Sequence, residues 1–310
     1  MLLHLTESIN RMCLRTTTTV LFFLLTSVVY AQTDVLRKKI RSLVEARQAN
    51  VGVAIVGPFG QDTLTLHGQQ HYPMQSTYKF PLALAVFHQI DHGQLRLDQT
   101  VHLTKADMLP TYSPLREQYP EGDVDITLQE LLRYTVTYSD NNACDILFRL
   151  LGGTAVADRY IRSLGIADIA IVATEEEMSR AWDVQYTNWT TPRAMARLLT
   201  EFYEGKHLAA GSRAVLWKMM VETVPGAKRL KGQLPAGTLV GHRTGTSDTN
   251  EQGVTAAVND VGVVVLPDGR TYTIVVLVSD SHEKPAVNEK IIADISKATW
   301  DHFLSSSKRK

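Results

Sequence analysis

The sequence contains little cysteine, no excess of charge of either sign and no long apolar run. Its 310 residues include two cysteines, and 32 basic residues balance 32 acidic ones. A formal net charge of zero argues against binding to nucleic acid or to an anionic membrane surface. Two cysteines cannot build a disulfide framework or a cysteine-rich metal site. The composition is that of an ordinary globular protein, so stability has to come from an apolar core.

The first 31 residues have the pattern of an export signal. Arg11 and Arg15 precede an apolar run over residues 20–29, and Ala31 supplies the small residue of a cleavage site. The run is too short to span a bilayer, and no cysteine follows it that would carry a lipid. We predict a signal peptide over residues 1–31, cleavage after Ala31, and an exported, periplasmic protein without a membrane anchor.

The mature chain has the pattern of a helix, two strands, a long helical segment, a further group of strands and a closing helix. The strands are expected at residues 51–56, 63–66, 239–243, 254–258, 261–266 and 272–278. Since an isolated hairpin is marginally stable, strands from both ends of the chain are expected to share one sheet. This predicts an α/β lobe, residues 32–75 and 226–310, and an inserted helical lobe, residues 76–225. A functional site is expected in the cleft between the lobes.

The most informative stretch is Ser76-Thr77-Tyr78-Lys79, at the head of an apolar run over residues 80–87. Because the run is apolar on every side, we expect a buried helix, with Ser76 and Lys79 one turn apart on one face. Burial disfavours the charged form of lysine, so Lys79 is able to take the hydroxyl proton and make Ser76 a nucleophile. The pattern alone is weak, because Ser-x-x-Lys also occurs in polar surroundings nearer the C-terminus.

A second motif, Tyr138-Ser139-Asp140-Asn141, lies between two helical stretches. An ordinary polar turn would explain these residues equally well. Beside Ser76 and Lys79, however, Ser139 can pass a proton from Lys79 to a leaving amine. Asn141 can then hydrogen-bond a substrate amide.

A third motif, His242-Arg243-Thr244-Gly245-Thr246, continues a predicted strand. A cation followed by a hydroxyl suits a substrate carboxylate, and Gly245 lets a substrate lie against the strand. The backbone N–H groups of Thr246 and Ser76 are candidates for an oxyanion hole. The alternative is an edge strand whose further pairing is blocked by a charge.

Two histidine pairs have the spacing of metal ligands on a helix, His67 with His71 and His88 with His92. Neither has the glutamate that a zinc protease carries after its first histidine. We interpret both pairs as surface histidines and predict no metal and no other cofactor.

In this order, the three motifs resemble those of the class A serine β-lactamases, across nearly the whole mature chain. Residues 76–81, 138–145 and 185–189 are similar to the PER, VEB and CfxA branch. The resemblance implies an antiparallel sheet flanked by N- and C-terminal helices, an inserted helical lobe, and an active site between the lobes. It also implies a monomer that hydrolyses the β-lactam amide of penicillins and cephalosporins and confers resistance to them.

The same resemblance implies roles for individual residues. Ser76 attacks the β-lactam carbonyl, Lys79 and Ser139 move protons, and Glu175 activates the water that hydrolyses the acyl-enzyme. Whether Lys79 or Glu175 is the base during acylation stays open. The implied substrate-binding residues are Tyr112, Asn141, Ser179, Arg229, Arg243, Thr244, Gly245 and Thr246.

Two residues depart from the family pattern. Ser179 stands where an asparagine usually helps to hold the water, and Arg243 stands where lysine is usual. Arginine keeps the charge but cannot act as a general acid, so we expect retained binding and a shifted substrate profile. The alternatives are a penicillin-binding DD-peptidase, an acylated β-lactam sensor and an esterase. Glu175 argues against the peptidase, and the carboxylate-binding pair Arg243-Thr244 argues against the esterase.

Overall fold

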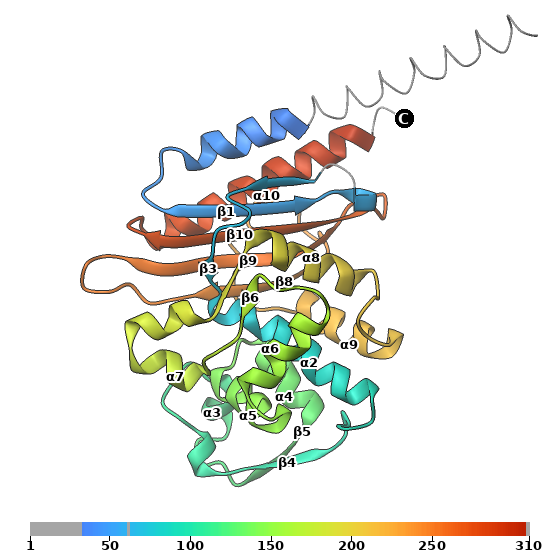
Figure 1. Cartoon of the computed structure of the whole chain (residues 1–310), viewed down its shortest axis with the longest axis vertical. Coiled ribbons are helices and arrows are strands. Elements are labelled where there is room, and N and C mark those ends of the chain that lie inside the picture. The colour runs from blue at the N-terminus through green and yellow to red at the C-terminus, as the bar shows by residue number, and fades with distance from the viewer. Residues whose placement is uncertain (1–32, 61–62, 308–310) are drawn as a thin grey trace, which may run out of the picture.

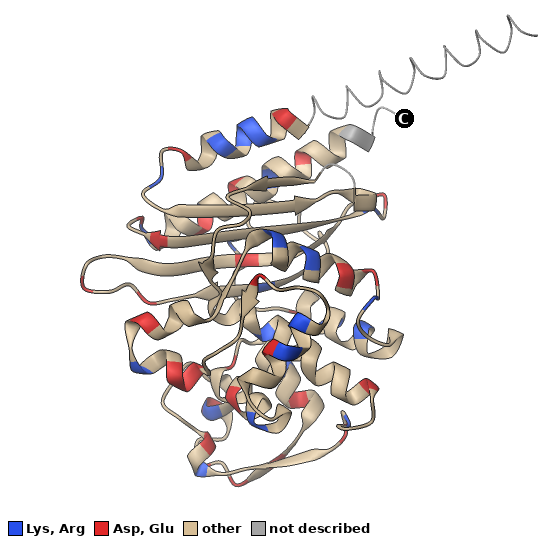
Figure 2. Ribbon diagram, viewed as in Figure 1, with Lys and Arg blue, Asp and Glu red and all other residues tan. Residues whose placement is uncertain are grey.

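The computed structural model describes residues 33–60 and 63–307, so the predicted signal peptide lies outside the described residues. No helix in this part of the chain is long and apolar enough to cross a membrane. Acidic and basic residues are interspersed along the described part of the chain (Figure 2), in line with the balanced composition.

Strands from both ends of the chain form one five-stranded antiparallel sheet in the order β2-β1-β10-β9-β8. Its strands are β1 (Asn50–Val56), β2 (Leu64–Leu66), β8 (Val240–Thr246), β9 (Thr255–Val265) and β10 (Thr271–Ser281). In the pairing of β1 with β10, Val53 lies opposite Val276. The turn between β9 and β10 uses Gly269 at a φ of 82°, a left-handed conformation that suits glycine. The predicted fold class is confirmed.

The two faces of this sheet bury separate apolar cores. Alternation along β10 sends Ile274 and Val276 to one face and Val275 and Leu277 to the other. The first face packs under the helix at residues 33–44 and under α10 (Pro285–Ser307), and the second packs on the helical part of the chain. Figure 1 shows the helix at residues 33–44 at the top of the molecule and α2 to α7 below the sheet.

The segment between residues 72 and 221 is mostly helical. Its helices are η2 (Gln75–Tyr78), α2 (Lys79–Asp91), η3 (Lys105–Asp107), α3 (Pro114–Gln118), α4 (Leu128–Thr137), α5 (Asn141–Leu151), α6 (Thr154–Ser163), α7 (Glu175–Arg180), η4 (Trp182–Thr187), α8 (Pro192–Tyr203) and α9 (Ala210–Val221); a short η1 (Pro58–Gly60) follows β1. The sequence predicted only helices over residues 76–225, and that was incomplete. Five short strands also occur in this segment: β3 (Tyr72–Pro73), β4 (Thr100–Leu103), β5 (Val124–Thr127), β6 (Ile169–Ala170) and β7 (Trp189–Thr190). Strands of two to four residues are too short to show a periodic pattern.

The prediction of separate strands at 254–258 and 261–266 was wrong, because β9 runs unbroken through both. The polar pair Asn259-Asp260, which resembles a turn in the sequence, is fully buried inside the strand. The Asn259 amide donates to the carbonyl oxygens of Pro73 (2.8 Å) and Met74 (3.1 Å), just before the Ser76 turn. A buried side chain thus links the sheet to the predicted site.

Candidate active site

Ser76 and Lys79 meet at the junction of η2 and α2, as the spacing predicted. The Lys79 ammonium donates to Ser76 Oγ at 3.1 Å, and α2 buries every residue from Lys79 to Phe87. Backbone strain accompanies this turn, because Gln75 adopts a φ of 48°. The nucleophile candidate is therefore held in a fixed backbone position at the start of a buried helix.

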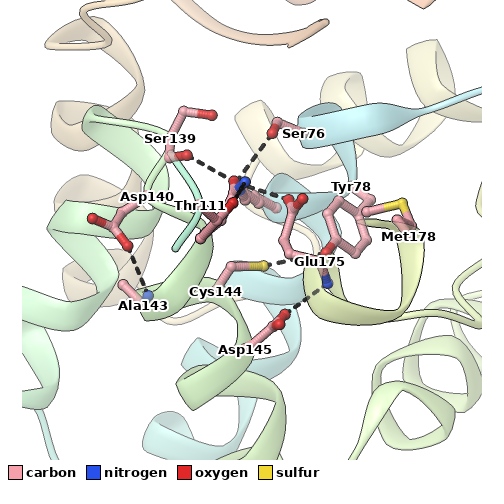
Figure 3. A network of polar contacts seen from close by, with 12 residues as sticks. Ser76, Tyr78, Thr111, Ser139, Asp140, Ala143, Cys144, Asp145, Glu175 and Met178 are labelled. Atoms are coloured by element: carbon pink, nitrogen blue, oxygen red, sulfur yellow. Dashed lines mark hydrogen bonds and ion pairs between the residues drawn. The ribbon is translucent and has the colours of Figure 1, made fainter. Parts of the chain in front are cut away.

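The fully buried Lys79 Nζ is surrounded by oxygen atoms from three elements. It donates to Asn141 Oδ1 at 2.6 Å and to the Ser139 carbonyl at 2.9 Å, and it lies 2.9 Å from Glu175 Oε1. Figure 3 shows Ser76, Ser139 and Glu175 converging on this point. All four predicted proton-handling residues come together here.

The loop that carries Ser139 and Asn141 is fixed by Asp140. Ser139 adopts a φ of 66°, and the buried Asp140 caps α5 by accepting from the Ala143 amide at 2.8 Å. The same carboxylate accepts from Ser113 Oγ at 2.9 Å and from the Leu115 amide at 2.7 Å. Burial raises the pKa of Asp140, while these donors favour its ionised form. A strained conformation at Ser139 is thus held by three neighbouring segments.

Among the three consecutive glutamates of α7, Glu175 alone has an ion pair with Lys79. Glu176 pairs with Arg180 on the surface at 2.7 Å, and Glu177 forms a capping box with Thr174. Of the three glutamates, Glu175 is therefore the one that contacts the buried amine.

Arg243 lies under the site and not in its open part. Its side chain is fully buried, and Nη2 donates to Ser139 Oγ at 2.6 Å. Burial lowers the pKa of Arg243 to about 10, so its guanidinium stays charged near neutrality. Because arginine only donates, Ser139 Oγ accepts this bond and keeps its own proton for another acceptor.

Gly245 brings β8 against the Ser76 turn. A Cβ on Gly245 would lie 2.4 Å from the Met74 carbonyl oxygen and 3.3 Å from the Ser76 backbone nitrogen. Only glycine permits this approach, which sets the start of Thr246 beside the Ser76 amide. The two candidate oxyanion donors are therefore neighbours in space.

These groups border a cavity of about 930 Å³. Its walls include the predicted residues Ser76, Tyr112, Ser139, Asn141, Glu175, Ser179, Thr244, Gly245 and Thr246. Neither His pair lies on it, and no cluster of three or more potential metal ligands occurs within residues 33–60 and 63–307. The cavity wall carries a nucleophile candidate, a carboxylate and hydroxyl groups, and the buried amine of Lys79 contacts Ser76 and Glu175 behind it.

Comparison with known proteins decides between the families that share these motifs. The β-lactamase enzyme family matches residues 35–303. β-Lactamase VEB-1 of Pseudomonas aeruginosa is 46% identical over 92% of this chain and 97% of its own length. Extended-spectrum β-lactamase PER-1 of the same organism is 44% identical over 88% and 89%.

The chain belongs to the class A serine β-lactamases. The crystal structure of TLA-1 extended-spectrum β-lactamase superposes with a TM-score of 0.86 at 50% identity, over 88% of this chain and 99% of that one. These similarities confirm the PER- and VEB-like branch. Like its relatives, this β-lactamase hydrolyses β-lactams.

Two of the predicted binding residues of this β-lactamase have other side-chain partners. Arg229 is buried behind β8, where it donates to the Gly245 carbonyl at 3.0 Å and to Thr246 Oγ1 at 2.7 Å. Ser179 borders the cavity, but its hydroxyl donates to the Glu176 carbonyl at 2.7 Å. Arg229 therefore does not border the cavity itself, but it donates to Thr246, which does.

Sequence reasoning missed Asp145, which holds the β-lactamase's α7 in place. Its carboxylate accepts from the Glu175 amide at 2.8 Å and from the Glu176 amide at 2.9 Å. Desolvation raises the pKa of Asp145 to about 6. Asp145 ends the stretch 138–145 that carries the family resemblance, and it lies four residues after Asn141 on the same helix face, but neither signal assigned it a role.

Proposed function

We propose that Ser76 is the nucleophile and that Lys79, in its neutral form, takes the Ser76 hydroxyl proton during acylation. Glu175 lies 2.9 Å from Lys79 Nζ and is able to hold the proton that the ammonium gives up. The neutral amine then accepts the proton of Ser76 Oγ, 3.1 Å away, as the oxygen attacks the β-lactam carbonyl. The single observation that carries this proposal is the contact of one buried amine with both Ser76 and Glu175.

Ser139 completes the opening of the ring by relaying to the leaving nitrogen the proton that Lys79 took from Ser76. The hydroxyl proton of Ser139 goes to the nitrogen, and the Lys79 ammonium replaces it. Arg243 donates to Ser139 Oγ, so the hydroxyl proton of Ser139 is free to go to the substrate. The backbone N–H groups of Ser76 and Thr246 stabilise the oxyanion that forms on the carbonyl. Glu175, which borders the cavity, returns its proton to the neutral Lys79 and then activates the water that releases the product. Ser179 borders the same cavity.

The substrate is held by the remaining residues of the cavity wall. Thr244 and Thr246 offer hydroxyl groups to the ring carboxylate, with the charges of Arg243 and Arg229 behind them. Asn141 keeps an amide group at the cavity, held through a donation of 2.9 Å to Thr111 Oγ1. Tyr112, which is 56% exposed, flanks the entrance.

The substrates include cephalosporins with large acyl side chains. Relatives of this chain, PER-1 and TLA-1, are named extended-spectrum β-lactamases. The lining of the cavity includes Trp182 and Gln185 of η4, and Ser247 and Asp248, which follow β8. Its volume of about 930 Å³ supports the binding of bulky groups there. We place the enzyme in the periplasm, on the strength of the signal pattern in residues 1–31.

Hydrolysis of nitrocefin by the purified mature protein tests this mechanism. Ser76→Ala should abolish turnover, and Glu175→Gln should accumulate an acyl-enzyme that intact-mass measurement detects. The matched control is Glu176→Gln, an identical change on the same helix at a residue that pairs with Arg180 on the surface. A long-lived acyl-enzyme in the unaltered protein would instead favour a penicillin-binding peptidase or an acylated sensor. Equal effects of the two glutamine substitutions would overturn the role of Glu175.

A further inference from the structure

Asp280 adopts a strained conformation near the end of β10. Its φ is 48°, in the left-handed region, although it lies within a strand. Ser279 pairs with Ala257 and Ser281 pairs with Thr255, whereas Asp280 between them has no partner on β9. A strained residue inside a central strand persists only when its surroundings compensate for it, and such residues cluster at functional sites.

The Asp280 carboxylate joins β10 to a distant segment of the chain. Oδ1 accepts from the Tyr186 hydroxyl at 2.7 Å, and Oδ2 accepts from Asn50 Nδ2 at 3.1 Å on the neighbouring strand β1. Burial, together with the bond to Asp280, raises the pKa of Tyr186 far above neutrality, so its phenol remains a donor. A hydrogen bond to an ionised acceptor is stronger than one between neutral groups.

Tyr186 belongs to η4, which forms one wall of the active-site cavity through Trp182 and Gln185. The Gln185 amide oxygen accepts from Gln75 Nε2 at 2.5 Å, directly beside the nucleophile. Two side-chain hydrogen bonds therefore hold the η4 wall. Gln185 accepts from Gln75 in the Ser76 turn, and Tyr186 donates to Asp280 in the sheet. Glu175, in contrast, is held separately, since Asp145 accepts from its amide.

We propose that Tyr186 and Asp280 are positioning residues that fix the η4 wall and thereby set which acyl side chains the cavity accepts. The proposal rests on the proposed function, in which this part of the cavity holds the acyl side chain. Neither residue borders the cavity or contacts Ser76, Lys79 or Glu175. Their effect is therefore expected on the binding of large side chains and not on the reaction of the carbonyl. Without the hydrogen bond from Tyr186 to Asp280, η4 has to be ordered when a bulky substrate binds. This loss of conformational entropy lowers the affinity for the substrate.

Tyr186→Phe removes only the hydroxyl group that donates to Asp280. For a cephalosporin with a branched oxyimino side chain, kcat/KM should fall about tenfold, the worth of one charge-assisted hydrogen bond, and mainly through KM. For benzylpenicillin, kcat/KM should stay within about twofold of the unaltered enzyme, because the ordering cost arises only with the larger side chain. Tyr119→Phe is the matched control, since its hydroxyl only accepts from the neighbouring Gln118.

Two substitutions at Asp280 separate the hydrogen bond from the backbone strain. Asn adopts left-handed conformations and keeps one oxygen that can accept from Tyr186, but it loses the charge, so Asp280→Asn should lose less selectivity than Asp280→Gly. Asp280→Gly relieves the strain but removes the acceptor, so it should reproduce the loss seen with Tyr186→Phe. An equal loss with both substrates, or no loss with either, would overturn the proposal. If the unaltered enzyme hydrolyses benzylpenicillin but not the bulky cephalosporin, the extended substrate range given under the proposed function is wrong.

Discussion

Lys79 shows how one buried residue depends on its neighbours. A fully buried ammonium is costly unless an opposite charge and hydrogen-bond acceptors replace the water it has lost. Here the carboxylate of Glu175 lies at 2.9 Å, and oxygen atoms of Ser76, Ser139 and Asn141 accept hydrogen bonds. The same contacts that make the charge tolerable place a proton carrier between the nucleophile and the carboxylate. At this residue, stability and chemistry use the same atoms.

Asp145 gives the stability of the enzyme a measurable pH dependence. Its pKa is raised from 3.8 to about 6 in the folded protein, so the folded state binds its proton more tightly than the unfolded chain does. Its contribution to the free energy of unfolding is therefore fully present below about pH 4 and is lost as the pH rises through 6. The difference between 3.8 and about 6 corresponds to about 3 kcal/mol.

Asp145→Asn should remove this slope. Denaturant unfolding of both proteins between pH 4 and 7 provides the measurement. The substitution removes one of the two side-chain oxygens that accept from backbone N–H groups, which changes the free energy of unfolding by the same amount at every pH. The titration of Asp145 adds a change that depends on pH. The difference in stability between the two proteins should change by about 3 kcal/mol across this range. A constant difference at every pH would show that the Asp145 carboxyl does not titrate there.

At the scale of elements, β8 can lie against the Ser76 turn because Gly245 has no side chain. Gly245→Ala would place a methyl group 2.4 Å from the Met74 carbonyl, so either β8 or the Ser76 turn has to move. A displacement of about 1 Å in a catalytic constellation can cost about a hundredfold in rate, and we expect a fall in kcat of that size. Overpacking should also cost about 1–3 kcal/mol of stability.

The control for this substitution is Gly211→Ala in α9, where a Cβ would meet no atom within 4 Å. It should leave kcat unchanged and be neutral or stabilising, because alanine has the higher helix propensity. Steady-state kinetics and thermal melting distinguish the two variants. If Gly245→Ala kept full activity, the close contact of β8 with the nucleophile turn would not be needed for catalysis.

The sequence predicted local features of the site well and features that depend on tertiary contacts poorly. Ser76 and Lys79 lie one turn apart on a helix, so their meeting follows from helical spacing alone. Asp145 has no such signal, because its role exists only after α7 has folded onto α5. The prediction of two strands on either side of Asn259-Asp260 failed for the same reason: the partners of this polar pair, the Met74 carbonyl and His242, lie on other elements.

At the scale of the whole molecule, the two cores meet around the sheet without a covalent link among the described residues. Cys144 is the one cysteine in this part of the chain, and it is free and fully buried. Its thiol lies 3.5 Å from the Tyr78 hydroxyl in the helical core that also carries Lys79. Burial raises the pKa of Cys144, so reactive thiolate is scarce in the folded state. Its exposure therefore requires α2 and α5 to separate.

Thiol labelling of the mature protein should report this separation. We expect no reaction of Cys144 with a thiol reagent under native conditions over hours, and one modified thiol per chain in denaturant. At intermediate denaturant concentrations, the free energy obtained from labelling should follow that of global unfolding with the same slope, since the thiol lies in the central core. A shallow slope would mean that α5 opens locally while the sheet stays folded. Such an opening would also release Asp140 and Asp145, and the active site would then be less stable than the rest of the fold.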